Sequence, residues 1–210
     1  MNDPQITKPL ASTARLRLYS PRDRLRLQET LAWKQDGTLL ELGFGGGGFL
    51  SLAGRYFHVL GIDHSSNARR KITPHLRSSM SVRKGEIESE ELGREHYDVA
   101  AAFNILEHLR QPADTVRKLH AALRESGILI GSVPNNQPGL GWISTMLSNI
   151  GDRTHISTFP AEAWRRIFEE AGFQQVRLFG ELLFTKYIGV YVRGPVWRKW
   201  TYNLMFVCSK

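Results

Sequence analysis

Residues 41–49 read Glu41-Leu42-Gly43-Phe44-Gly45-Gly46-Gly47-Gly48-Phe49, a glycine-rich run between two apolar segments. The preceding residues, 38–42, have the near-continuous apolar character of a buried strand, and a helix is predicted to follow the glycines. Glycine allows a sharp turn and lets a ligand approach the backbone, because no Cβ stands in the way. This order of strand, loop and helix predicts a nucleoside-binding turn at the edge of a parallel sheet.

The nature of the nucleoside ligand depends on two carboxylates. Asp63 ends the next apolar run, residues 58–62, where it can accept hydrogen bonds from both ribose hydroxyls. Gly43-x-Gly45-x-x-Gly48 also satisfies the dinucleotide fingerprint, so an oxidoreductase using a nicotinamide or flavin cofactor remains an alternative. Glu41 favours a nucleoside without a pyrophosphate, because its charge would repel a diphosphate and attract an amino group.

The rest of the chain alternates apolar runs with helical patterns. Further strands are expected at 81–83, 97–103 and 128–133, and helices are expected to begin near Pro21, Pro112 and Pro160. Segments 173–179 and 202–207 have no helical pattern between them, so they are expected to pair antiparallel. The sequence thus predicts one α/β domain over residues 1–210, with residues 1–20 as a loose arm. Its fold would be Rossmann-like: a doubly wound, mostly parallel, seven-stranded sheet with helices on both faces and an antiparallel C-terminal edge hairpin.

Composition limits the class of protein further. The chain has 210 residues, a single cysteine (Cys208) and a net charge of +8. One cysteine excludes an internal disulfide and a multi-cysteine zinc site, and we expect Cys208 to lie in the core. With no secretory pattern at Met1 and no long apolar run, the sequence favours a cytoplasmic protein. The positive charge favours anionic partners, with a basic solvated surface as the alternative.

Taken in order, the motifs resemble those of class I S-adenosylmethionine-dependent methyltransferases, particularly the small-molecule branch that includes ubiquinone-biosynthesis O-methyltransferases. The resemblance runs from about residue 38 to residue 179 and is much more specific than the glycines alone. It is carried by Glu41-x-Gly43-x-Gly45-x-Gly47, Asp63, Gly85-Glu86-Ile87, Asn104-Ile105-Leu106-Glu107-His108-Leu109, Ser126-Gly127-Ile128-Leu129-Ile130, Thr154-His155-Ile156-Ser157-Thr158-Phe159-Pro160 and Phe168-Glu169-Glu170-Ala171-Gly172-Phe173.

The resemblance implies S-adenosylmethionine as methyl donor, S-adenosylhomocysteine as product, and a role for each matching residue. Glu41 and the backbone near Gly43 and Asn104 would hold the methionine moiety, and Asp63 would bind the ribose. His64 would stack on the adenine, and Glu86 would accept from its amino group, although the family usually has aspartate there. The cofactor-binding residues expected on this basis are Glu41, Gly43, Gly45, Gly47, Asp63, His64, Glu86, Ile87 and Asn104.

Two of the seven histidines are candidates for catalysis. His108 and His155 fall in segments that border the donor pocket in the family, where an imidazole can take a proton from the acceptor. Some relatives bind a divalent ion through Glu-x-x-Glu-His, but this chain has Asn104 at the first position. Because Glu107 and His108 alone are poor ligands for a hard cation, no metal is predicted.

The acceptor is expected to contact segments 135–158 and 186–200, which lie outside the nucleoside half. The second segment mixes aromatic and basic residues, a composition suited to an anionic membrane surface, to nucleobases, or to packing on the core. No dedicated nucleic-acid module is present, so a small-molecule or lipid-linked acceptor, methylated on oxygen, is favoured. A cofactor-binding partner subunit without catalytic activity remains an alternative to the enzyme.

Overall fold

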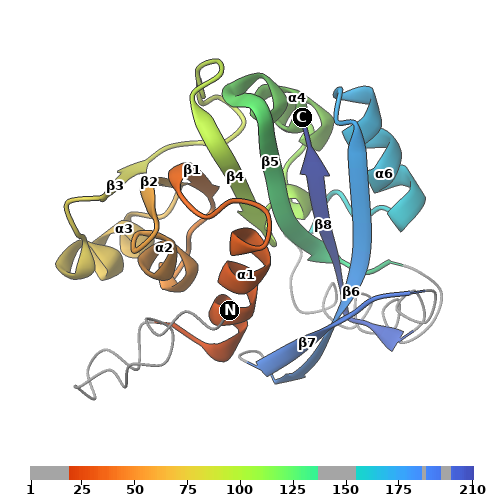
Figure 1. Ribbon diagram of the computed structural model, residues 1–210, viewed down its shortest axis with the longest axis horizontal. Coiled ribbons are helices and arrows are strands. Elements are labelled where there is room, and N and C mark those ends of the chain that lie inside the picture. Colours follow the sequence, from red (N-terminus) through yellow and green to blue (C-terminus); the bar gives the residue numbers. More distant parts are fainter. Residues whose placement is uncertain (1–18, 137–154, 186–187, 195–199) are drawn as a thin grey trace.

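The computed structural model describes residues 19–136, 155–185, 188–194 and 200–210, whose strands form one eight-stranded sheet (Figure 1). The strand order is β3-β2-β1-β4-β5-β8-β6-β7. The strands are β1 (Gly37–Leu42), β2 (Phe57–Asp63), β3 (Met80–Lys84), β4 (Tyr97–Phe103), β5 (Leu123–Pro134), β6 (Gln175–Thr185), β7 (Ile188–Val192) and β8 (Asn203–Ser209). Strands β1 to β5 run parallel, whereas β8, β6 and β7 join antiparallel, so the mostly parallel sheet with an antiparallel C-terminal edge is confirmed.

One detail of the expected sheet was wrong: it has eight strands, not seven. The additional strand, β7, lies within the segment 186–200 that was expected to be an insertion, and it pairs with a β6 that continues to Thr185. Its β-branched residues Ile188, Val190 and Val192 alternate with Gly189 and Tyr191, a pattern that suits a pleated edge strand. The sequence analysis did not predict this strand because the alternation is short and lies among aromatic and basic residues.

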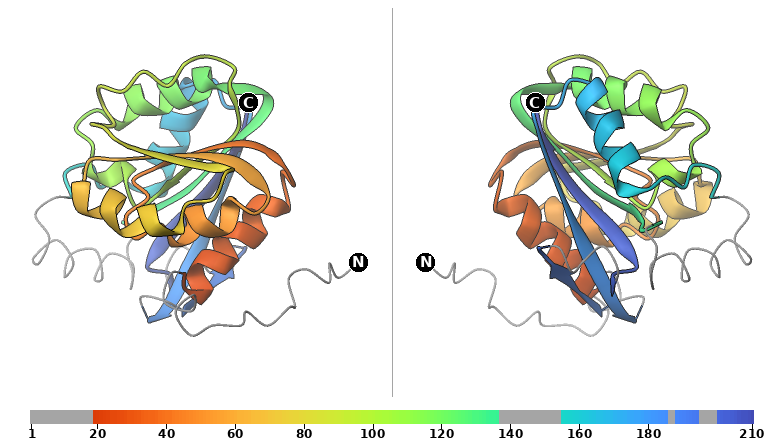
Figure 2. Two further views of the ribbon diagram at one scale, coloured as in Figure 1. Left: turned by 90° about the vertical axis from the view of Figure 1, so that its left-hand side faces the viewer. Right: turned by 90° about the vertical axis from the view of Figure 1, so that its right-hand side faces the viewer.

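Helices cover both faces of the sheet, as expected (Figure 2). The helices α1 (Pro21–Leu31), α2 (Gly48–Ala53) and α3 (Ser66–Ile72) pack on one face, and α4 (Pro112–Ala122) and α6 (Ala161–Glu170) on the other. Short 3₁₀ turns, η2 (Thr73–His75) and η3 (Leu106–His108), complete the described elements. Trp164 and Phe168 of α6 are fully buried on the second face, and Cys208 is buried in the core as predicted.

Helix α1 begins at a capping box. Ser20 accepts a hydrogen bond from the backbone N–H of Asp23, whose carboxylate accepts from the Ser20 N–H at 2.8 Å, and Pro21 occupies the first turn. The expected loose arm, residues 1–20, lies outside the described residues except for Tyr19 and Ser20. Figure 1 shows α1 in front of the sheet, where it packs against α2 and β7. The capping box therefore fixes where α1 begins, and with it the position of the side chains in its first turn.

No helix in the described ranges combines the length and the apolar character that a membrane span requires. Segments 135–158 and 186–200 were expected to contact the acceptor. Of these, residues 137–154, 186–187 and 195–199 lie outside the described residues.

Gly131 tests the packing at the centre of the sheet. A Cβ at this position in β5 would collide with the carbonyl oxygen of Ala102 in β4 and with the ring of Phe206 in β8. We expect Gly131→Ala to lower the free energy of unfolding by about 2–3 kcal/mol, because a strand backbone cannot move aside as a flexible side chain can. Urea unfolding measures this change.

Gly46→Ala is the matched control, since a Cβ there has no atom within 4 Å. We expect its urea midpoint to stay close to that of the wild type. Equal midpoints for Gly131→Ala and Gly46→Ala would contradict the tight packing of β4, β5 and β8.

Candidate functional site

The glycine loop leaves β1 in a left-handed turn. Gly43 and Gly45 have φ of +68° and +50°, a region that residues with a Cβ rarely enter. At Gly43 a Cβ would also collide with the side chain of Ile105, whereas the Cα positions of Gly45 and Gly46 face open space. Gly47, with φ of +73°, is the N-cap of α2. The loop thus presents bare backbone to the outside at Gly45 and Gly46.

Asp63 holds this loop in place from the end of β2. Its carboxylate accepts hydrogen bonds from the N–H groups of Gly45 and Ser65, each at 2.8 Å, and the residue is only 4% exposed. The N–H of Gly43 donates to the carbonyl of Ile62 at 2.8 Å. Each carboxylate oxygen can accept more than one hydrogen bond, so Asp63 keeps acceptor capacity for a ligand on the loop.

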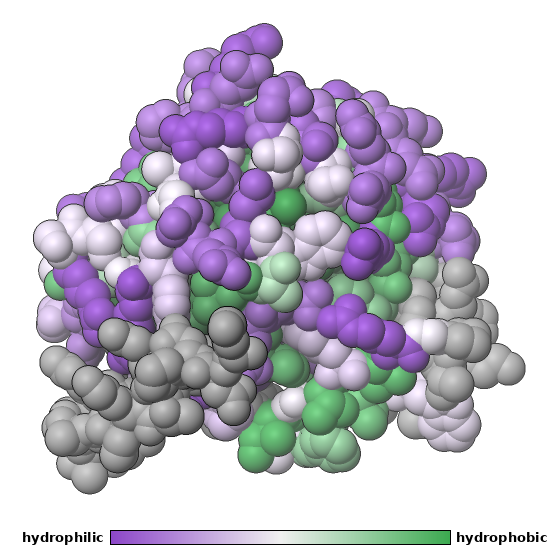
Figure 3. Space-filling model, viewed as in Figure 1, coloured by the Kyte–Doolittle hydropathy of each residue, from purple (hydrophilic) through white to green (hydrophobic). Residues whose placement is uncertain are grey.

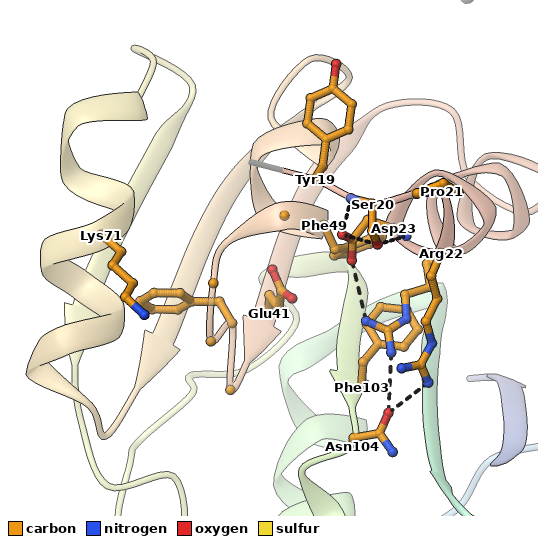
Figure 4. A pocket seen from close by; sticks show the side chains of 16 residues that line it. Tyr19, Ser20, Pro21, Arg22, Asp23, Glu41, Phe49, Lys71, Phe103 and Asn104 are labelled. Carbon is orange, nitrogen blue, oxygen red and sulfur yellow. Dashed lines mark hydrogen bonds and ion pairs between the residues drawn. The ribbon is translucent and has the colours of Figure 1, made fainter. Parts of the chain in front are cut away.

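A cavity of about 1080 Å³ opens at the carboxyl ends of β1 and β4, beneath the start of α1 (Figure 4). It is bounded by the glycine loop, α1, α2, the end of β4 and one side chain of α3. Four of the predicted cofactor residues meet here: Glu41, Gly43, Gly45 and Asn104. The residues that line it are Tyr19, Ser20, Pro21, Arg22, Asp23, Arg26, Glu41, Gly43, Phe44, Gly45, Gly46, Gly48, Phe49, Lys71, Phe103 and Asn104.

The predicted adenine-side residues lie outside the lining of this cavity. His64 follows Asp63 with its side chain 67% exposed, and its Nδ1 is 3.7 Å from an Asp63 oxygen. Glu86 is exposed, whereas Ile87 is buried in the core on the α4 and α6 face. Their assignments to the adenine therefore remain predictions, and of the three only His64 adjoins the loop through Asp63.

Glu41 is an uncompensated carboxyl group in the wall of the cavity. It is 4% exposed, and its Oε2 has no hydrogen-bond partner among the described residues. Burial raises the pKa of Glu41 to about 8; the charge of Arg26 opposes this rise, and those of Asp23 and Asp63 add to it. The group is therefore mostly protonated at neutral pH, and a cation placed beside it would favour its ionised form.

Two arginines of α1 enter the cavity, and the sequence reasoning missed both. Arg22 and Arg26 each bring Nη2 to 3.3 Å from Oδ1 of Asn104. The Arg26 guanidinium lies 4.4 Å from the centre of the Phe103 ring, and its Nε has no hydrogen-bond partner in the described part of the chain. Their spacing of four residues, which places both on one helix face, was a signal that could have found them.

Asn104 connects the cavity to a second group of polar residues. It adopts a φ of +54°, which asparagine tolerates better than most residues, directly after β4. Besides the two arginines, Ser132 Oγ donates to its Oδ1 at 2.9 Å, and its Nδ2 donates to Glu107 Oε1 at 3.3 Å. The predicted residue is therefore present at the site with every side-chain polar atom engaged.

The two candidate catalytic histidines lie together beside Glu107. The rings of His108 and His155 are 4.7 Å apart, and one ligand-type atom from each of the three residues lies within 4.8 Å of the others. Backbone N–H groups of Ile156 and Ser157 donate to the Glu107 carbonyl, which brings the segment after His155 to η3. This spacing would also suit a metal ion, so the expectation of no metal stays a prediction.

Glu107 is fully buried, and its Oε2 lacks a hydrogen-bond partner within the described residues. Burial raises its pKa to about 7, although hydrogen bonds from the backbone and Asn104 and the charges of Arg22 and Arg26 work against the rise. The cluster of Glu107, His108 and His155 does not line the cavity, and it joins the cavity wall through Asn104. It therefore places a carboxyl group with a pKa of about 7, beside two imidazole rings, next to a ligand-sized space.

The comparison with protein families identifies the chain. A family model described as a methyltransferase domain matches residues 13–178. The chain belongs to this family. Its fold is that of solved S-adenosylmethionine-dependent methyltransferases, as the structural comparisons below show.

Individual relatives agree with the family. A ubiquinone biosynthesis O-methyltransferase from Paraburkholderia phytofirmans is 34% identical over 117 residues, which cover 53% of this chain and 50% of the relative. The chain thus spans about half the length of the curated relatives it matches. Among solved structures, a SAM-dependent methyltransferase from Thermotoga maritima superposes with a TM-score of 0.72 at 18% identity, covering 92% of this chain and 90% of that one. Another from Archaeoglobus fulgidus gives 0.70 at 16% identity, covering 88% and 91%.

The chemistry of the cavity wall fits the amino-acid end of S-adenosylmethionine. Glu41, with an unpaired carboxyl oxygen, and Arg26, with an unpaired N–H in the described structure, both line this cavity. The methionine moiety carries an ammonium and a carboxylate, which are the groups that could satisfy this acceptor and this donor. The open face of Gly45 and Gly46 leaves room for the nucleoside beyond them.

The buried Glu41 should make the stability of the free protein depend on pH. Its folded pKa, about 8, lies above its ordinary value of 4.5, so the folded state retains a proton that the unfolded state releases. Stability is therefore lost as pH rises from 4.5 to about 8. We expect Glu41→Gln to remove part of this loss, on the order of 3 kcal/mol near pH 8.

Urea unfolding at several pH values, without ligand, measures the effect. Glu86→Gln is the control, because that carboxylate is exposed. Parallel pH profiles for the wild type and Glu41→Gln would contradict a buried, protonated Glu41.

Proposed function

We propose that this chain transfers the methyl group of S-adenosylmethionine to an oxygen of a small-molecule or lipid-linked acceptor. The observation that carries the proposal is that Glu41 and Arg26 line one cavity and each has a buried polar atom, Oε2 and Nε, without a hydrogen-bond partner in the described structure. Leaving such atoms unpaired costs about 1–3 kcal/mol each, a cost that a zwitterionic ligand would remove. Glu41, the glycines and Asp63 are all intact, which argues against a vestigial pocket.

In this proposal each wall of the cavity binds one part of the methyl donor. Glu41 accepts from the ammonium of the methionine moiety, and Arg26, supported by Arg22, binds its carboxylate. Asp63 accepts from the ribose hydroxyls above the glycine loop. On the adenine side we keep His64, Glu86 and Ile87 as predictions. Dense packing of α1 and α2 around this end would exclude water from the reacting groups.

The cofactor supplies a methyl group already activated on a sulfonium, so the chain needs no nucleophile of its own. Its residues align the acceptor with the donor and remove the acceptor's proton. His155 or His108 takes that proton, and Glu107, whose pKa is about 7, stabilises the resulting imidazolium. The two histidines are 4.7 Å apart, so one base and one acceptor-binding residue can share the site.

Oxygen as the methylated atom is supported by the O-methyltransferase relatives, at identities of 34% and 30%. A lipid-linked acceptor is supported by apolar side chains that remain exposed around the β6–β7 hairpin: Phe184 at 65%, Ile188 at 48% and Val190 at 43%. Figure 3 shows an apolar surface at this end of the molecule. Because the whole chain carries a net charge of +8, these exposed apolar residues would suit peripheral contact with an anionic membrane from the cytoplasm.

Calorimetric titration with S-adenosylhomocysteine, run beside NAD, tests the donor site. We expect micromolar-range binding of S-adenosylhomocysteine only, and a loss of roughly tenfold or more in affinity for Asp63→Ala and for Glu41→Gln. Asp63→Ala removes the acceptor for the ribose hydroxyls, whereas Glu41→Gln removes the charge that attracts the ammonium. Binding of NAD instead would replace the proposal with a dinucleotide-dependent oxidoreductase.

Asp98→Ala is the matched control for the donor titration. Asp98 also accepts a backbone N–H, from Thr38 at 2.8 Å, but it lies at the amino end of β4, away from the cavity. It should lose stability and keep its affinity for S-adenosylhomocysteine. If Asp98→Ala and Asp63→Ala lowered the affinity for S-adenosylhomocysteine equally, the effect of Asp63→Ala would be explained by lost stability and not by a lost ligand contact.

Transfer of a labelled methyl group to a panel of phenols, with and without alkyl tails, tests the second half of the proposal. We expect His155→Ala or His108→Ala to lower kcat by about 100-fold while the affinity for S-adenosylhomocysteine is unchanged, because the base acts on the acceptor. His58→Ala, an exposed residue of β2, is the control.

Donor binding without transfer to any acceptor would favour a partner subunit without catalytic activity. Unchanged kcat in both histidine variants would remove them from the mechanism.

A further inference from the structure

Helix α1 is joined to the C-terminal hairpin at both of its ends. Near its start, Arg22 of α1 pairs with Glu181 of β6, with Nη2 and Oε2 2.5 Å apart. Near its end, Glu29 pairs with Arg193, which follows β7, at 2.6 Å. Both pairs link positions more than 150 residues apart in sequence, at separations of 159 and 164 residues. The two pairs differ in their burial and in the further contacts that each arginine makes.

Glu181 is a fully buried carboxylate with donors on both oxygens. Arg22 Nε donates to Oε1 at 2.8 Å, Arg22 Nη2 donates to Oε2, and Asn203 Nδ2 of β8 donates to Oε2 at 3.0 Å. Burial alone would raise the pKa of Glu181, but the hydrogen bonds from Arg22 and Asn203 and the charges of Arg22 and Arg26 outweigh it and hold the pKa below its usual range. Glu181 is therefore ionised and fixed in place.

A buried ion pair is an inefficient way merely to anchor a helix. Apolar side chains of similar volume often stabilise a protein as well or better, because they avoid the desolvation of two charges. The position of the Arg22 guanidinium suggests what the pair does instead. Its Nη2 lies at hydrogen-bond distance from both Glu181 and Asn104 Oδ1, so it bridges β6 and the wall of the cavity.

We propose that Glu181 is a positioning residue for the methyl donor, which holds Arg22 against Asn104 and so fixes the polar wall of the cavity. Glu181 itself does not line the cavity, and it acts through Arg22 and Asn104, which do. The inference rests on the proposed function of the cavity and adds to it a residue from the C-terminal hairpin. Without Glu181, Arg22 would lose its buried counter-charge and turn to solvent. Asn104 Oδ1 would then accept hydrogen bonds from Arg26 and Ser132 only among its three donors in the described structure.

The second ion pair is a control that the chain itself provides. Glu29 and Arg193 join the same helix to the same hairpin, but Arg193 is 59% exposed and its guanidinium lies over the Phe179 ring at 4.5 Å. Neither residue lines the cavity or contacts Asn104 through any interaction found in the described residues. A purely structural link between helix and hairpin would make the two pairs equivalent, whereas the proposal makes only Glu181 matter for the donor.

The experiment compares Glu181→Gln with Glu29→Gln. Glutamine keeps the size of each side chain and removes its charge. We expect Glu181→Gln to weaken binding of S-adenosylhomocysteine about tenfold and to raise KM for S-adenosylmethionine similarly, with kcat at saturating donor close to the wild type. We expect Glu29→Gln to bind within about twofold of the wild type.

Arg22→Gln and the double variant Arg22→Gln/Glu181→Gln separate positioning from folding. Removing both partners leaves no buried unpaired charge, so the double variant should regain thermal stability relative to Glu181→Gln. Its affinity for S-adenosylhomocysteine should stay as low as that of Arg22→Gln alone, because Glu181 acts only through Arg22. A structural role would instead restore affinity together with stability.

Three results would overturn the inference while leaving the proposed function standing. These are wild-type affinity in Glu181→Gln, equal losses in Glu181→Gln and Glu29→Gln, and recovery of affinity in the double variant. Failure of the wild type to bind S-adenosylhomocysteine would instead overturn the proposed function, and this inference with it.

Discussion

The candidate site depends on the convergence of hydrogen bonds on Asn104. Its Oδ1 accepts from Arg22 and Arg26 of α1 and from Ser132 of β5, and its Nδ2 donates to Glu107 of η3. A side chain amide that both accepts and donates can join cations on one side to a carboxyl group on the other. The left-handed φ of Asn104 turns the chain out of β4 at this point, so strand topology and side-chain network meet in one residue.

Buried ionisable side chains lie around Asn104, and in the ligand-free protein other side chains pair with them only in part. Burial raises the pKa of Glu41 and Glu107, and burial together with the charge of Arg22 lowers that of Arg26. Of the buried glutamates Glu41, Glu107 and Glu181, it is Glu181 whose donors hold the pKa below its usual range and keep the group ionised. Polar groups that are left unpaired in an otherwise dense core weaken the free protein, and such strain is expected where a ligand completes the network. A ligand that paired these groups would therefore stabilise the cavity wall.

Sequence reasoning reached the parts of this arrangement that depend on neighbours along the chain. The apolar strands, the glycine turn and Asp63 are local patterns, and all seven expected strands and the mixed sheet are present. Asp63 could be placed beside the loop because the carboxyl ends of adjacent parallel strands share one edge of a sheet. The eighth strand was missed because β7 is short and its pairing partner, the extension of β6 beyond Phe179, had been given no strand pattern.

The network itself could not have been predicted, because it joins the two ends of the chain. Arg22 and Glu181 are 159 residues apart, and nothing in either local pattern names the other as its partner. Each looks like an ordinary surface charge, on an amphipathic helix or at the end of an edge strand. They become partners only when the antiparallel tail inserts β8 and β6 beside β5, which carries Glu181 back to the start of α1. The tail thus supplies, from outside the cavity lining, the carboxylate that pairs with Arg22 in the cavity wall. The C-terminal strands therefore contact the candidate site through Arg22, in addition to forming the antiparallel edge of the sheet.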